Sequence, residues 1–257
     1  MKPVLLKPQR KIVGQSKIEL ESVESTNSWV LERPDLLAMD GLVVTARSQT
    51  GGRGRYNRPW SGGSARHLFT TLVIHPTLLP EYIPTITLLL GLATHRALAE
   101  HNVKGVAIKW PNDLLIEGKK FCGILCEMKL IEPEQKVIVA GIGMNLEGSI
   151  SQFPPELWGK VITLHEGSGI LLRPEDILET ILNQFDLILN DLDAPKIELL
   201  LREWERNSCS IGKIIEYKLR EETRVGSIFG LQNNGALRVK RFNGEIDELI
   251  SGEVNWK

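Results

Sequence analysis

The residues with the clearest chemical potential lie in one basic, glycine-rich segment. Between Gly41 and Pro80 the chain has five arginines and neither an acidic residue nor a lysine. A segment of this length in this chain would ordinarily hold about five acidic residues. Its centre, residues 51–63, reads GGRGRYNRPWSGG. Glycines let backbone amides approach a ligand closely, and arginine forks bind phosphate or carboxylate in pairs of hydrogen bonds. The segment predicts a polyanion site, with a solvated basic loop as the alternative, and Trp60 favours a nucleotide base stacked beside the phosphates.

A second group of polar residues is the run Lys109-Trp110-Pro111-Asn112-Asp113. Pro111 favours an extended Trp110, and Asn-Asp then favours a turn, so the plain interpretation is a hairpin corner. The run also offers a cation, an amide and a carboxylate that could bind magnesium. Gly118-Lys119-Lys120 begins the next predicted strand and could return a lysine to the side of Asp113.

Two weaker signals lie on either side of these. Glu24-Ser25-Thr26-Asn27 precedes an apolar run and by itself indicates a helix N-cap. Gly141-Ile142-Gly143-Met144-Asn145 follows an apolar strand and by itself indicates a strand exit. The second run lacks the third glycine of a dinucleotide-binding fingerprint, and the chain has no P-loop motif.

The apolar pattern predicts an α+β fold, a mixed sheet covered by helices. The expected strands are Leu42–Arg47, Leu68–His75, Val106–Trp110, Leu114–Ile116, Lys120–Met128 and Lys136–Ala140. The expected helices are Tyr82–His101, one that starts near Pro174 and carries Ile177 to Leu192, and Ala194–Arg206. After Cys209, short alternating runs separated by Asn-Gly pairs predict hairpins. We therefore expect a catalytic or binding domain at residues 1–208 and a small SH3-like β-barrel at residues 209–257.

Composition excludes a disordered, fibrous or histone-like protein and one with an acidic tail. The chain has 257 residues, 31 basic against 32 acidic side chains, and 42% hydrophobic residues, which is typical of a globular domain. The longest apolar stretch, Ile86–Ala93, is far shorter than the ~20 residues of a membrane helix. The first eleven residues lack the apolar region of a secretory signal. A cytoplasmic protein with no membrane span is expected.

Taken together and in this order, five motifs resemble those of biotin protein ligases. They are Glu24–Asn27, Gln49–Trp60 (QTGGRGRYNRPW), Lys109–Asp113, Gly118–Leu125 (GKKFCGIL) and Gly141–Asn145. Each motif alone is weak, but five in sequence order are specific. The resemblance implies a ligase that joins biotin to ATP, giving biotinyl-5′-AMP and pyrophosphate. It then transfers biotin to a lysine of a carrier domain of acetyl-CoA carboxylase.

The resemblance also implies roles for individual residues. The residues that it places around biotin are Ser25, Thr26, Asn27, Gln49, Gly52, Arg53, Gly54, Arg55, Lys120 and Gly123. Those that it places around ATP are Arg53, Arg55, Arg58, Trp60, Lys109, Asn112, Lys120 and Asn145. The catalytic groups would be Arg55, Lys109, Asp113 and Lys120, with Asp113 as the candidate ligand of a magnesium ion that accompanies ATP.

The chain departs from the family pattern at two loop positions. Asn57 stands where glycine is common, and asparagine tolerates positive φ. Pro59 stands where a basic residue is common, which changes the expected contacts of Trp60. Only 23 residues precede Glu24, too few for the DNA-binding domain of the larger members, so a ligase without repressor function is expected.

Three questions stay open at this level. A lipoate or octanoate ligase or transferase would share the fold, although its apolar substrate gives no reason for the polar Ser25 to Asn27 and Gln49 set. A nucleic-acid-binding module would use the arginine loop, yet the loop offers few aromatic residues for stacking. An exposed strand edge could serve a homodimer, the carrier domain, or both in turn.

Overall fold

A computed structural model of the chain describes residues 12–62, 65–132, 135–219, 222–252 and 254–256. The strands are β1 (Ser16–Val23), β2 (Leu42–Gln49), β3 (Leu68–Ile74), β4 (Val106–Lys109), β5 (Asp113–Ile116), β6 (Lys119–Leu130), β7 (Lys136–Met144), β8 (Ile214–Leu219), β9 (Glu222–Leu231), β10 (Leu237–Arg241), β11 (Ile246–Leu249) and β12 (Asn255–Trp256). The α-helices are α1 (Thr26–Leu31), α2 (Pro34–Leu37), α3 (Thr85–Glu100), α4 (Leu164–Ser168), α5 (Pro174–Leu189) and α6 (Ala194–Arg206). The 3-10 turns are η1 (Arg55–Asn57), η2 (Pro80–Tyr82), η3 (Ile150–Gln152) and η4 (Pro155–Leu157).

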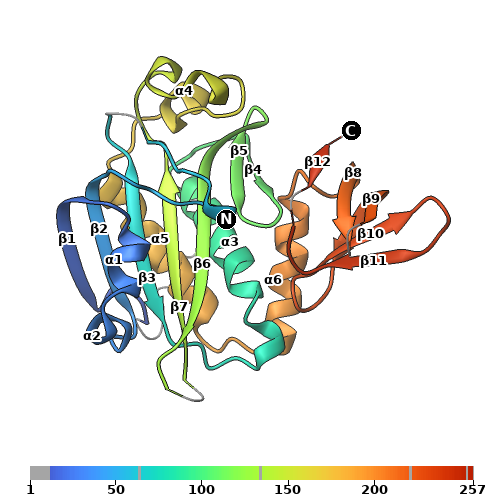
Figure 1. Cartoon of the computed structure of the whole chain (residues 1–257), viewed down its shortest axis with the longest axis horizontal. Helices are drawn as coiled ribbons and strands as arrows, with labels where there is room; N and C mark the ends of the chain where they lie inside the picture. Colours follow the sequence, from blue (N-terminus) through green and yellow to red (C-terminus); the bar gives the residue numbers. More distant parts are fainter. Residues whose placement is uncertain (1–11, 63–64, 133–134, 220–221, 253, 257) are drawn as a thin grey trace, which may run out of the picture.

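The larger part of the chain is built on a seven-stranded mixed sheet in the order β1-β2-β3-β7-β6-β5-β4 (Figure 1). Only β1 and β2 pair in parallel, and the other neighbours are antiparallel. Along its strands, successive side chains point alternately into two apolar layers, one on each face of the sheet. On β7, for example, Ile138 and Ile142 lie in the larger core, while Val137 and Val139 lie in the smaller one.

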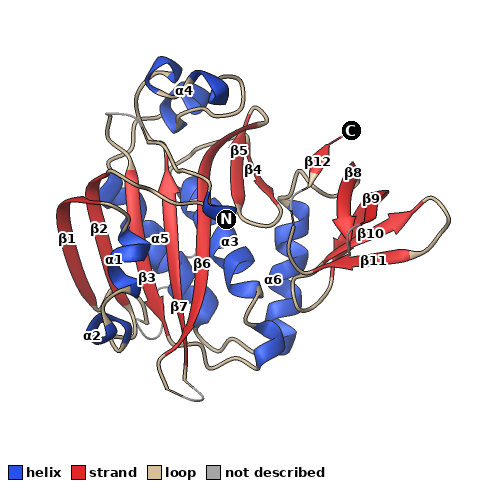
Figure 2. Ribbon diagram, in the orientation of Figure 1, coloured by secondary structure: helices blue, strands red, loops and turns tan. Residues whose placement is uncertain are grey.

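Helices cover the two faces of this sheet unequally. The long helices α3, α5 and α6 pack on one face, and the short helices α1 and α2 lie on the other (Figure 2). Helix α5 begins with Pro174, whose missing amide hydrogen costs nothing at that position, and buries Ile177, Ile181 and Phe185 along one stripe. Helix α6 begins where the side chain of Asp193 accepts a hydrogen bond from the backbone amide of Lys196. The expected helix-covered mixed sheet is confirmed.

Several strands and helices begin or end at other residues than hydrophobic periodicity predicted. The strand expected to end at Ala140 continues through Gly141 and Gly143 to Met144, because β7 remains paired with both β3 and β6. The interpretation of residues 141–145 as a strand exit was therefore wrong for all but its end. The edge strand β1 was not expected, although its exposed Lys17, Glu19 and Glu21 alternate with Ile18 and Leu20, which is the pattern of a half-buried strand. Helix α3 is shorter than expected, since η2 precedes it.

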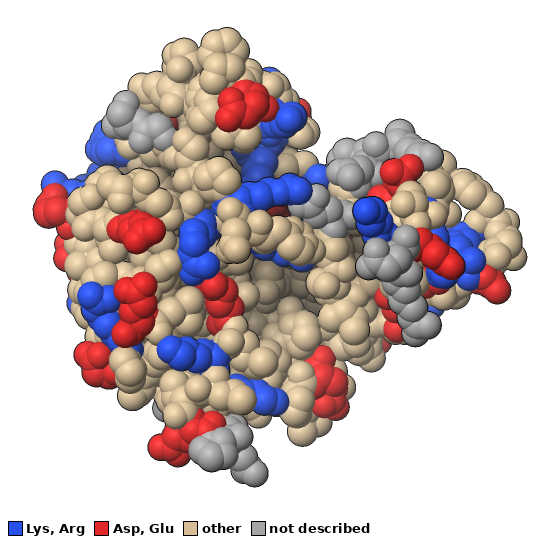
Figure 3. All heavy atoms as spheres, viewed as in Figure 1, with Lys and Arg blue, Asp and Glu red and all other residues tan. Residues whose placement is uncertain are grey.

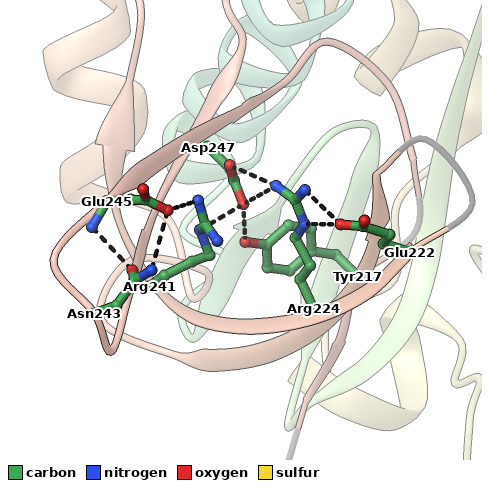
Figure 4. Close-up of polar contacts among 7 residues, drawn as sticks. All are labelled: Tyr217, Glu222, Arg224, Arg241, Asn243, Glu245 and Asp247. Atoms are coloured by element: carbon green, nitrogen blue, oxygen red, sulfur yellow. Dashed lines mark hydrogen bonds and ion pairs between the residues drawn. The ribbon is translucent and has the colours of Figure 1, made fainter.

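The C-terminal residues form a five-stranded antiparallel sheet in the order β11-β10-β9-β8-β12. The predicted Asn-Gly turns at 234–235 and 243–244 do join β9 to β10 and β10 to β11. This sheet contacts the larger part through Trp110, whose backbone amide donates to Ser210 Oγ and whose indole donates to the Gly235 carbonyl. A buried carboxylate, Asp247, lies within the sheet and contacts Tyr217, Arg224 and Arg241 (Figure 4).

Among the parts of the chain that the structure describes, no helix is both long enough and apolar enough to span a membrane.

Candidate functional site

The main cavity of about 290 Å³ opens on the sheet face opposite the long helices, beside the C-terminal sheet. Figure 3 shows the corresponding hollow, with Lys and Arg side chains beside and above it. The predicted residues that line the cavity are Ser25, Thr26, Asn27, Gln49, Arg53, Gly54, Arg55, Arg58, Trp60, Lys109, Asn112, Asp113, Lys120, Gly123 and Asn145. Residues far apart in the sequence thus meet at one place. Gly52 alone among the predicted residues is not part of the lining.

One end of the cavity is polar and is built on the N-terminus of α1. Ser25 caps the helix by accepting from the Ser28 amide, so the plain N-cap interpretation is correct and the residue also lines the cavity. The backbone amide and hydroxyl of Thr26 lie 2.8 and 3.1 Å from Gln49 Oε1. Thr71 Oγ1 lies 2.8 Å from Thr26 Oγ1 and 2.7 Å from Asn27 Oδ1. These buried and partly buried polar groups form a continuous network.

A carboxylate from β6 extends this network to the arginine loop. Glu127 accepts from Asn27 Nδ2 at 2.9 Å and from Arg53 Nη2 at 3.2 Å to each oxygen. Arg53 Nε also donates to Ser28 Oγ at 2.9 Å. Two of the predicted biotin residues are therefore held by one acidic side chain that the sequence motifs did not single out.

The other end of the cavity is cationic, and its centre is Lys120. The Nζ atom of Lys120 lies 2.6 Å from Asp113 Oδ1 and 5.1 Å from the centre of the Trp60 ring. The Lys120 main chain is fixed on both sides, because its amide donates to Lys160 and its carbonyl accepts from Ile162. Arg55, Arg58 and Lys109 complete the cationic lining. Such a concentration of fixed positive charge suits phosphate or carboxylate groups.

The floor of the cavity is a patch of sheet without side chains. Gly123 on β6 and Gly143 on β7 are cross-strand partners, and the Trp60 indole lies over both. A Cβ atom on Gly143 would lie 2.6 Å from the Trp60 ring, and one on Gly123 would lie 2.9 Å from Trp60 and from Lys120 Nζ. A Cβ atom on Gly141 would lie 2.4 Å from Asn27 Oδ1. The glycines are thus required by the close approach of these side chains.

The arginine loop has a defined conformation. Gly54 donates to the Arg58 carbonyl, and Arg53 and Pro59 form an isolated β-bridge. Tyr56 and Asn57 both adopt positive φ, at 56° and 55°, so Asn57 accepts the conformation for which glycine would otherwise be favoured. Gly52 packs under this loop, because a Cβ atom there would lie 2.7 Å from the Trp60 carbonyl oxygen.

Arg55 connects the loop to the C-terminal part of the chain. Its Nη1 donates to the Gly252 carbonyl at 3.1 Å, and its Nη2 lies 3.3 Å from the Tyr56 hydroxyl. Gly252 and Val254 also line the cavity. The C-terminal segment is thus part of the candidate site, which no sequence motif indicated.

Two predicted nucleotide ligands, Asn112 and Asn145, differ in the hydrogen bonds that their side chains make within the protein. Asn112 Nδ2 donates to the Ile124 carbonyl, which locks the β4–β5 corner onto β6. The backbone of Asn145 pairs with Phe121 and Leu164. However, Asn145 Oδ1 is buried and has no hydrogen-bond partner among the described residues. A buried acceptor of this kind is costly unless a ligand or water supplies a donor.

A buried histidine holds the backbone of Leu146, the residue that follows Asn145. His67 Nδ1 accepts from the backbone amide of Leu146, and its ring packs against Phe69 and Phe153. Burial lowers the pKa of His67 from its ordinary value to about 4, so the ring is neutral at pH 7.

The donor set suits magnesium only as a partner of phosphate. Asp113 is the single carboxylate among the residues described as lining the cavity. Elsewhere in the described ranges no group of three His, Cys, Asp or Glu residues lies close enough to hold a metal. Magnesium commonly binds through one or two carboxylates together with substrate phosphates and water, and Asp113 fits that mode.

Four contributors to the site were missed by sequence reasoning. Glu127 and Thr71 hold the polar end, and Gly143 forms the floor beneath Trp60. Gly252 contacts Arg55. For Glu127 a signal existed, because a single acid in an otherwise apolar strand segment usually has a buried partner. Residues 71 and 252 carried no such signal.

Comparison with known proteins agrees with this arrangement. Residues 19–145 match the model of the "Biotin/lipoate A/B protein ligase family". The chain is 28% identical over 243 residues to the "Bifunctional ligase/repressor BirA" of Bacillus subtilis, covering 95% of this chain and 74% of that protein. It is 28% identical over 221 residues to the "Biotin--[acetyl-CoA-carboxylase] ligase" of Paracoccus denitrificans, covering 85% and 91% of the two chains.

Solved structures give the same picture. The structure of the biotin protein ligase of Aquifex aeolicus in complex with biotin and ATP superposes with a TM-score of 0.77 at 27% identity. The match covers 95% of this chain and 99% of that one. Residues 19–145 of this chain thus form a domain of the biotin/lipoate A/B protein ligase family.

Proposed function

We propose that this chain is a biotin–protein ligase that activates biotin with ATP and transfers it to a lysine of a carrier domain. The main support for this proposal is that one cavity has both a polar end, with hydrogen-bonding groups on α1, and a cationic end centred on Lys120. A small acid with a polar head group fits such a cavity with its carboxylate toward the cations. Relatives named as biotin–[acetyl-CoA-carboxylase] ligases support acetyl-CoA carboxylase as the carrier.

The proposed first step is adenylation of the acid. A carboxylate oxygen of biotin attacks the α-phosphorus of ATP, and the bond to the leaving pyrophosphate breaks. Two unit charges 4 Å apart repel by about 4 kcal/mol at an effective dielectric of 20. Arg55 and Lys120 offset that repulsion and stabilise the charge that develops on the phosphorus oxygens. Magnesium held by Asp113 and the phosphates would supply further neutralising charge.

The proposed second step is acyl transfer. The unprotonated amine of the carrier lysine attacks the acyl carbon of the adenylate, and AMP leaves with the bonding electron pair. The amine loses its proton as the amide forms. Arg55, Arg58 and Lys109 remain beside the leaving phosphate and disperse its charge.

The polar end of the cavity favours biotin over lipoate or octanoate. Ser25, Thr26, Asn27 and Gln49 are nearly buried or partly buried and carry both donors and acceptors, which a ureido ring needs. An aliphatic chain would offer no hydrogen bond to the capacity that these groups keep beyond their bonds within the protein, which costs a few kcal/mol in such sites. Asn145 Oδ1 suits the exocyclic amino group of adenine, and Trp60 offers a stacking surface beside it.

The smaller sheet completes the proposal. We infer that residues 209–257 form a separate SH3-like barrel domain. Strands β8 to β11 follow one another in antiparallel order, and β12 returns to the free edge of β8. Their inward side chains, among them Ile215, Ile228 and Val239, are fully buried.

An open strand edge supports self-association. Strand β6 pairs with β7 as far as Leu130, but its pairs with β5 end at Gly123. Beyond the contact of Ile124 with Asn112, this edge has no strand partner within the described ranges. Met128 and Leu130 beside it are more than half exposed. We infer that the edge pairs with a second copy to give a homodimer, and sedimentation as a monomer at every concentration, with and without biotin and ATP, would contradict this.

The direct test of the proposed function is pyrophosphate exchange into ATP by the purified chain. Biotin, lipoate, octanoate or no acid is added in separate reactions. Exchange with biotin alone is expected, and addition of a carboxylase carrier domain should then yield biotinylated carrier. Exchange only with lipoate or octanoate would assign the chain to the other branch of its family. Absence of exchange with every acid would overturn the proposal.

A further inference from the structure

Glu127 occupies an unusual position between two parts of the cavity that come from distant segments. Its carboxylate contacts the amide of Asn27 on α1 and the guanidinium of Arg53 in the arginine loop. Asn27 is 3% exposed, and the side chains of Glu127 and Arg53 are about a quarter to a third exposed. Hydrogen bonds to an ionised group in such a setting are stronger than those between neutral groups.

The contacts of Asn27 define which end of its amide is the donor. The nitrogen lies within hydrogen-bond distance of two acceptors, the Leu125 carbonyl at 3.1 Å and Glu127 Oε2 at 2.9 Å. Neither acceptor can donate a proton, so the nitrogen must lie on that side. The oxygen then faces Thr71 Oγ1 and retains the capacity for a second donor. Asn27 can therefore offer the cavity an acceptor but no donor.

The contacts of Arg53 separate it from the other arginines of the loop. Its Nε and Nη2 donate to Ser28 and Glu127. Arg55 instead donates to the Gly252 carbonyl, and its guanidinium forms no ion pair with a carboxylate among the described residues. Two of the three guanidinium nitrogens of Arg53 are thus committed to the protein, and the residue anchors the loop to α1 and β6.

We propose that Glu127 is a positioning residue that orients Asn27 and anchors Arg53, so that the acid-binding end presents an acceptor at Asn27 Oδ1. The inference rests on the proposed function and names the group that organises its biotin end. The ligand feature that it selects is an N–H donor, which a ureido ring has and which lipoate and octanoate lack. Glu127 itself touches none of the reacting atoms.

The test uses the near-isosteric variant Glu127→Gln in the full chain. Glu203→Gln is a matched control, because Glu203 forms a similar two-point pair with Arg96, is equally exposed at 28%, and lies outside the cavity.

Titration calorimetry measures the Kd for biotin and for ATP, and exchange kinetics give KM and kcat. Glu127→Gln should weaken biotin binding about tenfold, as expected when a charged acceptor is lost. Its Kd for ATP and its kcat at saturating biotin should change by less than about threefold, and Glu203→Gln should leave all four values near those of the unaltered chain.

A double-mutant cycle distinguishes positioning from general loosening. If Glu127 acts through Asn27, the Glu127→Gln/Asn27→Ala variant should lose less biotin affinity than the product of the two single losses. Independent losses, or equal weakening of biotin and ATP, would overturn the inference. Thermal melts identify any variant that fails to fold, and Arg53→Gln in the same cycle then replaces Asn27→Ala. If the unaltered chain binds no biotin, the proposed function fails and the inference with it. Normal biotin binding by Glu127→Gln would overturn the inference alone.

Discussion

Lys120 and Asp113 face each other across adjacent strands, with 2.6 Å between Nζ and Oδ1. Strict alternation along β6 would place Lys120 on the same face as Cys122, which is buried against the long helices. The pairing of β6 with β5 shifts register there, so that Leu114 lies opposite Cys122 and Leu115 lies opposite Lys120. The extra residue, Phe121, is buried, and Lys120 faces the cavity. A bulge thus supplies the central cation of the site.

This relationship predicts the effect of removing the cation. Lys120→Met should lower the rate of biotin-dependent pyrophosphate exchange by about a hundredfold to a thousandfold, because a fixed group that stabilises developing charge is lost. The melting temperature should change much less than the activity. Lys17→Met is the control, since Lys17 also pairs with a carboxylate, Glu179, but on the surface. Retention of full exchange by Lys120→Met would remove Lys120 from the catalytic groups.

A pair of glycine substitutions tests the flat floor. Gly143→Ala places a methyl group 2.6 Å from the Trp60 ring, so the ring must move, and we expect the KM for ATP to rise about tenfold or more. Gly91→Ala in α3 is the matched control, because its new methyl group would meet neighbours only at 3.7 Å or more. That variant should be about 0.4–1 kcal/mol more stable, since alanine restricts the unfolded chain. Steady-state kinetics and urea unfolding measure both, and an unchanged KM in Gly143→Ala would show that Trp60 does not contribute to nucleotide binding.

The buried His67 predicts a loss of stability in mild acid. Burial lowers its folded-state pKa to about 4, whereas the unfolded chain binds a proton near the ordinary value of 6.5. Between these values the unfolded state binds more protons, so the free energy of unfolding should fall as the pH decreases from 6.5 toward 4. Urea unfolding at several pH values measures this dependence. The His67→Gln variant should show a weaker dependence over the same range, and an identical slope would place the effect on other groups.

The carboxylate of Asp247 should stabilise the C-terminal sheet. Tyr217 donates to it at 2.6 Å and Arg224 at 2.9 Å, and these hydrogen bonds outweigh burial, so the pKa of Asp247 lies below its ordinary value (Figure 4). Asp247→Asn should lower the unfolding midpoint more than Tyr217→Phe, because it leaves two arginines without their shared acceptor. Glu222→Gln is the control, since Glu222 contacts the same Arg224 from the surface. Equal midpoints for all three variants would contradict a structural role of the cluster.

Periodicity and turn chemistry located most of the regular structure. The bounds of α6 agree with the apolar pattern, and the Asn-Gly turns of the C-terminal sheet lie where expected. The edge strand β1 was missed, although Ile18 and Leu20 alternate with charged residues as in a half-buried strand. The end of β7 was misplaced, since glycines usually interrupt strands, whereas here Gly141 and Gly143 remain paired and leave room for Asn27 and Trp60.

The sequence by itself determined which chemical groups are available. It also determined their resemblance to one family, because the motifs of arginine, lysine and glycine can be recognised from residue type and order along the chain. Only the tertiary structure decided which groups share a contact. The bulge at Phe121 turned Lys120 toward Asp113, and the fold brought Glu127 to Arg53 and Gly252 to Arg55. Such contacts join residues that lie from 7 to 197 positions apart. They depend on strand register and on the packing of separate elements, neither of which a local pattern specifies.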